Sequence, residues 1–303
     1  MSASEETPLT GGKTSSGTIR FVKEVNIEYL RFVSLMAIVF MLICGKFVTE
    51  YFNNWPYRED HSSPWDKLFN GAPSDFEYTE TFIYKAFGFN HTCSLLDFNP
   101  SKTIAAMAMM VHEVPILLFV VLHYFRLMGR SEPKYDNIKS FSKIATPIQF
   151  VTILFFYMVF VNSPDGEYGT PEGMKQFAAH FTPYFLWQTG VYLMAIQQCW
   201  FLSLSDRIPF SWVTSDMLWL YVKGMFVVYV GWNWFIWSIV YGSPLFDTST
   251  LSGLIIAQTF QWLFTITSIV IPAIFAYAES KDTRTISRIV FEEVIAGDET
   301  VLV

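Results

Sequence analysis

The segment IAAMAMMVHEVPILLFVVLHYFR, residues 104–126, is long and apolar enough to cross a bilayer, since a spanning helix needs about 20 mostly apolar residues. Its middle nevertheless carries His112 and Glu113 side by side, followed by Pro115 and, near its end, His123. Titratable groups at membrane depth are costly, and they mark either a functional site or a buried partner. The segment therefore predicts a membrane protein with chemistry inside one of its helices.

The rest of the chain has the composition of a polytopic membrane protein. Of its 303 residues, 52% are hydrophobic, 18% are aromatic and only 16% are charged, which lies outside the range of ordinary soluble domains. The net charge is −7 and no basic stripe is present, so nucleic acid is not an expected partner. The cysteines, Cys44, Cys93 and Cys199, are too few for a disulfide framework.

The apolar segments predict an all-α membrane protein, a six-transmembrane-helix bundle over residues 27–280. The six expected spans are 29–48, 103–126, 144–162, 178–204, 214–241 and 251–278. The polar residues 1–26 are expected to form a disordered cytosolic tail, and residues 281–303 a cytosolic C-terminal tail. The long connection 49–101 is rich in aromatic residues, so it should pack as a cap on the bundle.

Basic residues set the expected orientation. They flank the first span, the 127–143 connection and the end of the last span: Lys13, Arg20, Lys23, Arg31, Arg130, Lys134, Lys139, Lys143, Lys281, Arg284 and Arg288. Because cytosolic loops carry the excess of Lys and Arg, both termini are predicted to be cytosolic, with Arg31 snorkelling to the interface. The 49–101 connection is then extracellular or lumenal, and its sequon Asn90-His91-Thr92 predicts glycosylation at Asn90.

One face of the 103–126 span collects polar and aromatic side chains. His112, Pro115, Phe119, His123 and Arg126 are spaced by three or four residues, so they share that face. Pro115 removes a backbone hydrogen bond and frees a carbonyl one turn earlier. His112 could contact a lipid head group or an ion there, or it could be a core histidine satisfied by a neighbouring helix. His123 and Arg126 are expected to anchor the cytosolic end.

Glu113 needs its own partner, and Lys223 is the predicted one. Each lies about ten residues, or roughly 15 Å, along its own span, so both fall near the midplane. A buried pair of this kind is tolerated only when it is well paired. It could be structural, or it could gate ion movement.

Two further groups complete the candidate set. His180 opens the fourth span near the outer surface, where it could bind a head group or serve as an interface residue. Gln258 and Gln261 lie three residues apart, so they share one face of the sixth span. Polar side chains in this arrangement either hold helices together or line a path for a lipid or an ion. The candidate lipid- or ligand-binding residues are therefore His112, Glu113, Pro115, His180, Lys223, Gln258 and Gln261.

Some motifs resemble those of a known family. They are His112-Glu113-Val114-Pro115, the aromatic run His123-Tyr124-Phe125 and, more loosely, His180 with the apolar residues that follow it. With six spans and a long first lumenal loop, the chain resembles the FRAG/DRAM-type membrane family, which includes the damage-regulated autophagy modulators and the Golgi post-GPI-attachment factor. The resemblance implies a lipid- or GPI-handling role in the Golgi, the endolysosome or the plasma membrane.

Three function classes remain open. The first is binding or handling of a membrane lipid, with no catalytic residue assigned. The second is a proton- or ion-coupled transporter or channel that uses Glu113 and Lys223, although no inverted repeat supports it. The third is an accessory subunit with membrane-protein partners. A haem carrier is disfavoured because His112 and His180 fall at different depths, and neither a cofactor nor a metal is expected.

Overall fold

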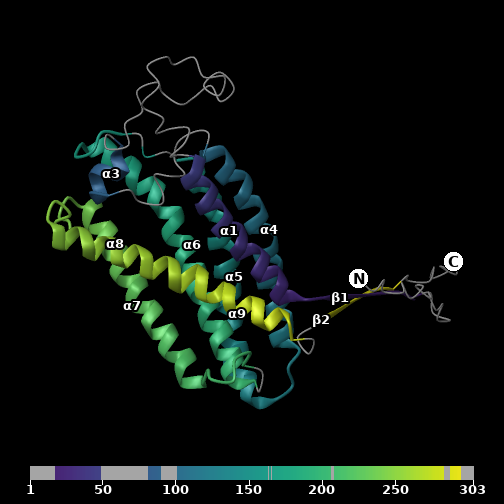
Figure 1. Ribbon diagram of the computed structural model, residues 1–303. Helices are drawn as coiled ribbons and strands as arrows, with labels where there is room; N and C mark the ends of the chain where they lie inside the picture. The colour runs from purple at the N-terminus through teal and green to yellow at the C-terminus, as the bar shows by residue number, and fades with distance from the viewer. Residues whose placement is uncertain are drawn as a thin grey trace, which may run out of the picture.

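The structure is a computed structural model that describes residues 18–48, 81–89, 101–162, 164, 166–205, 208–282 and 287–294. These residues form a helical bundle with one short β-ribbon at its side, so the helical fold class is confirmed (Figure 1). The α-helices are α1 (Ile27–Val48), α3 (Phe82–Phe87), α4 (Ser101–Met128), α5 (Asp136–Leu154), α6 (Pro171–Leu204), α7 (Ser215–Val240), α8 (Leu251–Thr265) and α9 (Ile271–Ser280). Two 3-10 helices, η3 (Pro133–Tyr135) and η4 (Phe155–Phe160), flank α5, and the π-helix η5 (Ile266–Val270) joins α8 to α9.

The long helices pack in a ring in which neighbours in sequence are neighbours in space. Helix α1 packs against α4, α4 against α5, α5 against α6, α6 against α7 and α7 against α8. Helices α8, η5 and α9 form one continuous oblique rod that crosses the bundle and brings α9 back onto α1 (Figure 1). The contact between α1 and α9, the first and last helices of the chain, therefore closes the ring.

Four of the described helical segments are long and apolar enough to cross a membrane: Ile27–Gly45, Ser101–Met128, Pro133–Phe160 and Leu251–Ser280. They indicate a multi-pass membrane protein. The outer surface of the bundle is consistent with contact with lipid, since large apolar side chains such as Leu118, Leu220 and Trp234 are exposed there. Helices α6 and α7 are also long but are not among these four segments, since α6 buries several amides and α7 is rich in tryptophan and tyrosine.

An aromatic core holds α3 against the ends of α6 and α7. The ring of Phe82 lies 4.9 Å from that of Phe177, and the ring of Phe87 lies 5.9 Å from that of Trp232, centroid to centroid. Both phenylalanines of α3 are buried. The described part of the 49–101 connection therefore packs on the bundle as a cap, while Asn90 lies outside the described residues.

A glycine sets the distance between α5 and α6. A Cβ atom on Gly190 would lie 2.5 Å from Oγ1 of Thr152, which is closer than any real contact. Beside this contact, Gln149 donates to Gln197 at 2.7 Å, and Gln197 donates to the hydroxyl of Ser142 at 2.9 Å. These buried amides are paired across the two helices, as buried polar groups must be.

Part of each expected tail forms a strand. Strand β1 (Thr18–Val25) pairs with β2 (Ser287–Val294) in antiparallel register, with Val25 opposite Ser287. The side-chain amide of Asn26 donates to the carbonyl of Ser280 at 2.7 Å, which ties the start of α1 to the end of α9. The expected tails 1–26 and 281–303 thus differ from the structure here, because the ring brings the start of α1 and the end of α9 together, and the two flanking segments pair.

Candidate functional site

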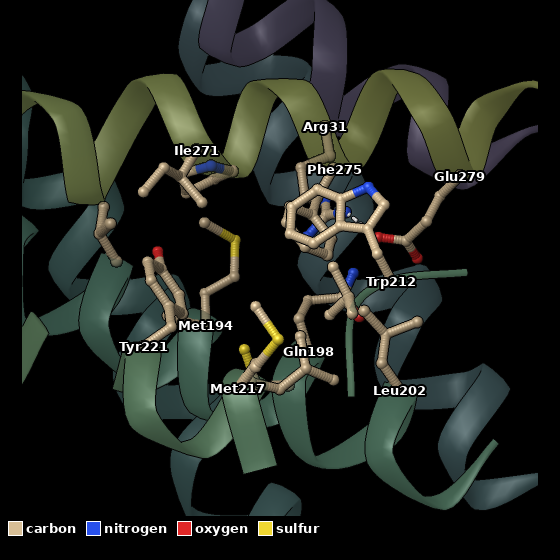
Figure 2. A pocket seen from close by; sticks show the side chains of 16 residues that line it. Arg31, Met194, Gln198, Leu202, Trp212, Met217, Tyr221, Ile271, Phe275 and Glu279 are labelled. Atoms are coloured by element: carbon tan, nitrogen blue, oxygen red, sulfur yellow. Dashed lines mark hydrogen bonds and ion pairs between the residues drawn. The ribbon is translucent and has the colours of Figure 1, made fainter. Parts of the chain in front are cut away.

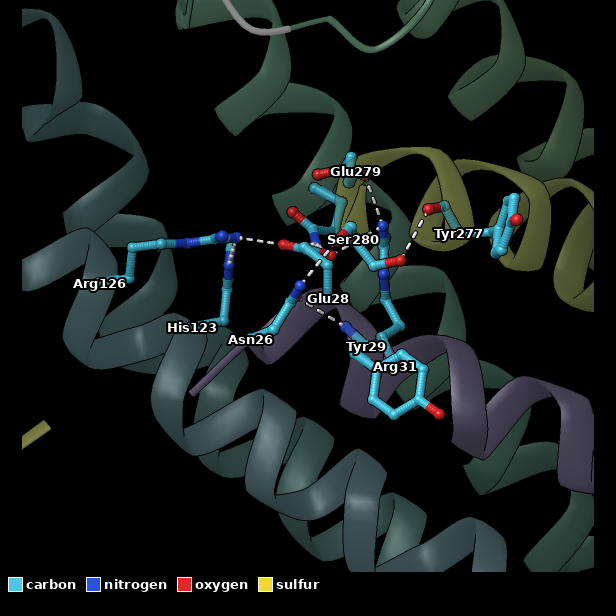
Figure 3. A network of polar contacts seen from close by, with 10 residues as sticks. Asn26, Glu28, Tyr29, Arg31, His123, Arg126, Tyr277, Glu279 and Ser280 are labelled. Carbon is cyan, nitrogen blue, oxygen red and sulfur yellow. Dashed lines mark hydrogen bonds and ion pairs between the residues drawn. The ribbon is translucent and has the colours of Figure 1, made fainter. Parts of the chain in front are cut away.

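Four charged side chains meet inside the bundle, at the end from which the β-ribbon leaves. Arg31 contacts Glu279 at 2.5 Å and Glu28 at 3.0 Å, and Arg126 contacts Glu28 at 2.8 Å, all between side-chain nitrogen and oxygen atoms (Figure 3). Glu28 is fully buried, and none of the other three side chains is more than 10% exposed. We call these four residues the charge cluster.

The charge cluster is balanced and further hydrogen-bonded. It holds two carboxylates and two guanidinium groups, so no buried charge is left uncompensated. The amide nitrogen of Gln198 donates to both oxygens of Glu28, at 3.3 and 3.2 Å. Arg126 also donates to Nδ1 of His123 at 2.6 Å. Because a guanidinium can only donate, Nδ1 accepts, and the neutral ring carries its proton on Nε2.

The expectation that Arg31 snorkels outward to the interface is wrong, and His123 and Arg126 likewise face into the bundle. Arg31 and His123 are buried, the Arg126 side chain is only 10% exposed, and the two arginines lie over aromatic rings, Arg31 at 5.3 Å from Phe119 and Arg126 at 4.5 Å from Phe201. The carboxylates that pair with these arginines are Glu28, at the start of α1, and Glu279, at the end of α9. The sequence alone does not show that these two helix ends meet. The sequence does show Glu28 and Arg31 three residues apart at the start of an apolar span, and this spacing could have indicated a buried ion pair.

A cavity of about 230 Å³ opens beside the charge cluster. It exists because α7 packs against α6, α8 and η5, whereas α9 leaves α7 and packs against α1. The wedge between α6, α7 and α9 is lined by Arg31, Val191, Met194, Ala195, Gln198, Cys199, Leu202, Trp212, Val213, Met217, Leu218, Tyr221, Ile271, Pro272, Phe275 and Glu279 (Figure 2). Sequence reasoning did not find this cavity.

The cavity has an apolar body and one polar end. Arg31, Gln198 and Glu279 form the polar end, and each is at least nine-tenths buried. At the rim, Trp212 is 66% exposed and Met217 is 42% exposed. Mostly apolar walls with a few convergent polar groups are typical of sites that bind apolar ligands.

A π-helical turn shapes one wall. Within η5 the backbone bonds run to the fifth residue back, as the bond from Ile271 to the carbonyl of Ile266 shows. Pro272 has no N–H group, so the next carbonyl, that of Thr267, loses its helical donor. The hydroxyl of Tyr221 donates to that carbonyl at 2.5 Å instead. Single π-turns of this kind are frequent at functional sites.

His112 occupies a saturated position in the core rather than the cavity. Trp187 donates to its Nε2 at 3.4 Å, so the proton lies on Nδ1, which faces the hydroxyl of Ser34 at 2.7 Å. That hydroxyl in turn donates to the His112 carbonyl at 2.9 Å, one turn before Pro115. These contacts fit a core histidine that neighbouring helices satisfy, rather than one that contacts a lipid head group or an ion.

Glu113 and Lys223 are not brought together. Helix α4 packs against α1 and α5, whereas α7 packs against α6 and α8. Lys223 is exposed on α7, and Oε1 of Glu113 has no hydrogen-bond partner among the described residues. The predicted pair is therefore wrong, because equal depth in the membrane says nothing about position around the ring.

The remaining candidates lie apart from the cavity. His180 is buried, and its Nδ1 contacts the backbone oxygen of Asn162 at 2.5 Å, which ties α6 to the chain after η4. Gln258 and Gln261 share one face of α8, where Gln258 is half-buried and Gln261 is buried. Neither residue lines the cavity or belongs to the charge cluster.

In the described part of the chain, no group of three or more His, Cys, Asp or Glu side chains is placed to hold a metal ion. Comparison with protein-family models, with curated proteins and with solved structures gave no match to this chain. The fold and the cavity therefore define a class, a multi-pass helical membrane protein with an internal apolar cavity.

Proposed function

We propose that the protein is a lipid-binding membrane protein that holds one lipid chain in the cavity between α6, α7 and α9. The observation that carries the proposal is the apolar cavity of about 230 Å³, which is open beside Trp212 and closed by buried polar groups. An apolar cavity of about 150 Å³ in another protein binds benzene, so this one is large enough for a segment of a lipid chain. The chain leaves bilayer hydrocarbon rather than water, so packing against the cavity walls holds it and the binding is reversible.

The proposal includes six spans with both termini on the cytosolic side. Helix α7 has 26 residues, and at about 1.5 Å per residue it exceeds the roughly 30 Å of a hydrocarbon core. Helix α6, with 34 residues, is longer still. The positions of the basic residues favour this orientation. A glycan on Asn90, lost in Asn90→Gln and removable by glycosidase only after membrane permeabilisation, tests it.

The orientation also bears on which lipid pool is used. The cavity lies at the bundle end where α1 begins and α9 ends, which this topology places in the cytosolic leaflet. The FRAG/DRAM-type resemblance favours a lipid-handling role in the Golgi, the endolysosome or the plasma membrane. A GPI head group lies on the lumenal face, so we propose a cytosolic-leaflet lipid in preference to a GPI anchor.

Photolabelling tests the proposal. Purified protein in nanodiscs would be irradiated with a phospholipid bearing a diazirine near the middle of one chain, and labelled residues mapped by mass spectrometry. Met194 is only 5% exposed and lines the cavity, whereas Leu118 is 48% exposed on the outer face of α4. We expect labels at both sites, because a lipid chain enters the cavity. Labels at Leu118 without any at Met194 would reject the proposal.

A further inference from the structure

We propose that the β-ribbon joins two copies of this chain, by pairing β2 of one copy with β2 of the other in antiparallel register. Among the described residues the sheet has only two strands, so each strand keeps one edge that no described strand covers. Figure 1 shows the ribbon leaving the side of the bundle and running away from it. A two-stranded ribbon is marginally stable in water, and independent stability needs more strands. The proposal goes beyond lipid binding and does not depend on it.

The two strands carry the same pattern of charge, Arg-x-Val-x-Glu. It spans residues 20–24 in β1 and residues 288–292 in β2. The observed register is centred on this pattern, since Val22 is opposite Val290 and each arginine is opposite the glutamate of the other strand. Opposite charges directly across an antiparallel strand pair stabilise it. Because the reversed pattern is its own complement, a strand that carries it can also pair with a copy of itself.

Pairing two β2 strands around Val290 matches every position of the pattern. Val290 is then opposite Val290 of the second copy, and Arg288 is opposite Glu292 of the second copy on both sides of the axis. Ile289 is opposite Phe291 of the second copy, and such pairs of a β-branched and an aromatic residue stabilise sheets. The resulting sheet has four strands in the order β1-β2-β2-β1.

The charges also match across all four strands of this sheet. In one chain, Arg20 of β1 is opposite Glu292 of β2. The proposed pairing places Arg288 of the second copy next to Glu292, and Glu24 of the second copy lies beyond that arginine. The signs therefore alternate along the row, and the symmetric row on the other side of the axis has the same order. No like charges are opposite each other in either row.

The edge of β2 suits this pairing better than the edge of β1. Two β1 strands paired around Val22 would put Lys23 opposite Phe21 of the second copy. Lysine on an edge strand is one of the features that discourage further pairing. The corresponding positions of β2 hold Ile289 and Phe291, so its edge offers an apolar pair where the edge of β1 offers a lysine.

The pairing is compatible with two copies inserted the same way in one membrane. Such copies are related by a two-fold axis along the membrane normal, and a two-fold axis perpendicular to a sheet generates an antiparallel strand pair. Strand β2 follows α9 in the chain and runs away from the bundle, so the two bundles lie at opposite ends of the sheet (Figure 1). The eight residues of β2, at about 3.4 Å each, span roughly 27 Å and separate the bundles.

Cysteine cross-linking of the full-length protein in phosphatidylcholine liposomes tests the proposal. Val290→Cys puts a thiol on the proposed axis, where opposite Cα atoms lie about 4.5–5.5 Å apart, within the range that a disulfide spans. Val22→Cys is the matched control, because its two copies are three strand spacings, or roughly 14 Å, apart. The unaltered protein, with three cysteines of its own, gives the background. On mild oxidation, we expect Val290→Cys to form a disulfide-linked dimer at least about tenfold faster than Val22→Cys.

Two charge reversals separate pairing between copies from pairing within one chain. Arg288→Glu puts like charges opposite each other within the ribbon, at Glu24, and also between copies, at Glu292. Arg20→Glu does so within the ribbon only, again at Glu292. In protein that carries Val290→Cys, we expect Arg288→Glu to slow dimer formation about tenfold relative to Arg20→Glu. That factor corresponds to about 1.4 kcal/mol over the two symmetric pairs.

Each outcome decides one part of the proposal. Fast cross-linking of Val22→Cys without that of Val290→Cys would move the interface to β1 and overturn the assignment to β2. No disulfide between copies with either variant would overturn the pairing itself. Equal rates for Arg288→Glu and Arg20→Glu would overturn the charge matching between copies. Lipid labelling at Met194 reports on a different site, so the proposed lipid-binding function is decided separately.

Discussion

Arg31 on α1 and Glu279 at the end of α9 are 248 residues apart in the sequence, and their side chains meet at 2.5 Å inside the bundle. This contact joins the first and last long helices and closes the ring. The same two side chains form part of the polar end of the cavity. The contact that completes the fold therefore also forms part of one end of the cavity.

Arg31→Met should destabilise the protein strongly. The substitution leaves Glu279 without the guanidinium of Arg31 and removes one of the two guanidinium groups that contact Glu28, and breaking a buried pair costs about 3–5 kcal/mol. Thermal unfolding in detergent measures the loss. Lys134→Ala, which breaks a half-exposed pair with Glu132, serves as the control, because surface pairs contribute about 0–1 kcal/mol.

The double variant Arg31→Met/Glu279→Met should recover much of that loss. It removes one positive and one negative charge, and Glu28 keeps its contact with Arg126 at 2.8 Å. Replacing a buried pair by apolar side chains is often neutral or stabilising. A double variant as unstable as Arg31→Met alone would contradict the charge balance described above.

Gly190→Ala and Gly224→Ala should shift stability in opposite directions. The new methyl at Gly190 would meet Thr152 at 2.5 Å and push α5 from α6, whereas nothing lies within 4 Å of one at Gly224. Overpacking costs about 1–3 kcal/mol, and alanine in an exposed helix interior gains up to about 1 kcal/mol over glycine. Equal melting temperatures for the two variants would refute the close packing at Gly190.

Glu113→Gln and Lys223→Ala should act independently. The two residues lie on α4 and α7, which are not packed neighbours in the ring, so no coupling between them is expected. In a double-mutant cycle, separated sites add to within about 0.5 kcal/mol. A coupling energy above about 1 kcal/mol would revive the pair predicted from membrane depth, and with it the transporter hypothesis.

His112→Ala should reduce stability but leave lipid capture unchanged. It removes partners from Ser34 and Trp187, and each buried polar group left unpaired costs about 1–3 kcal/mol. Folded His112→Ala protein should therefore show wild-type labelling at Met194. Loss of that labelling with an unchanged melting temperature would assign His112 to the lipid site after all.

The sequence was most informative about four of the six expected spans, which the described helices match, because an apolar stretch of fixed length is a local property. It also placed His112 and His123 correctly on one shared face, which the structure buries. The charge cluster was missed because it depends on the contact between α1 and α9, which are far apart in the sequence. The cavity was missed because it arises from the angle at which α9 leaves α7, and no residue pattern records that angle.

The most direct test of the account is to fill the cavity. Ala195 lies in the cavity wall and is 8% exposed, so Ala195→Leu places new atoms in the space assigned to the lipid. Ala106→Leu on α4, away from the cavity, is the matched control. With the phospholipid probe, we predict that labelling at Met194 falls at least about tenfold in Ala195→Leu and is unchanged in Ala106→Leu. Wild-type labelling at Met194 in folded Ala195→Leu protein would contradict lipid binding in this cavity.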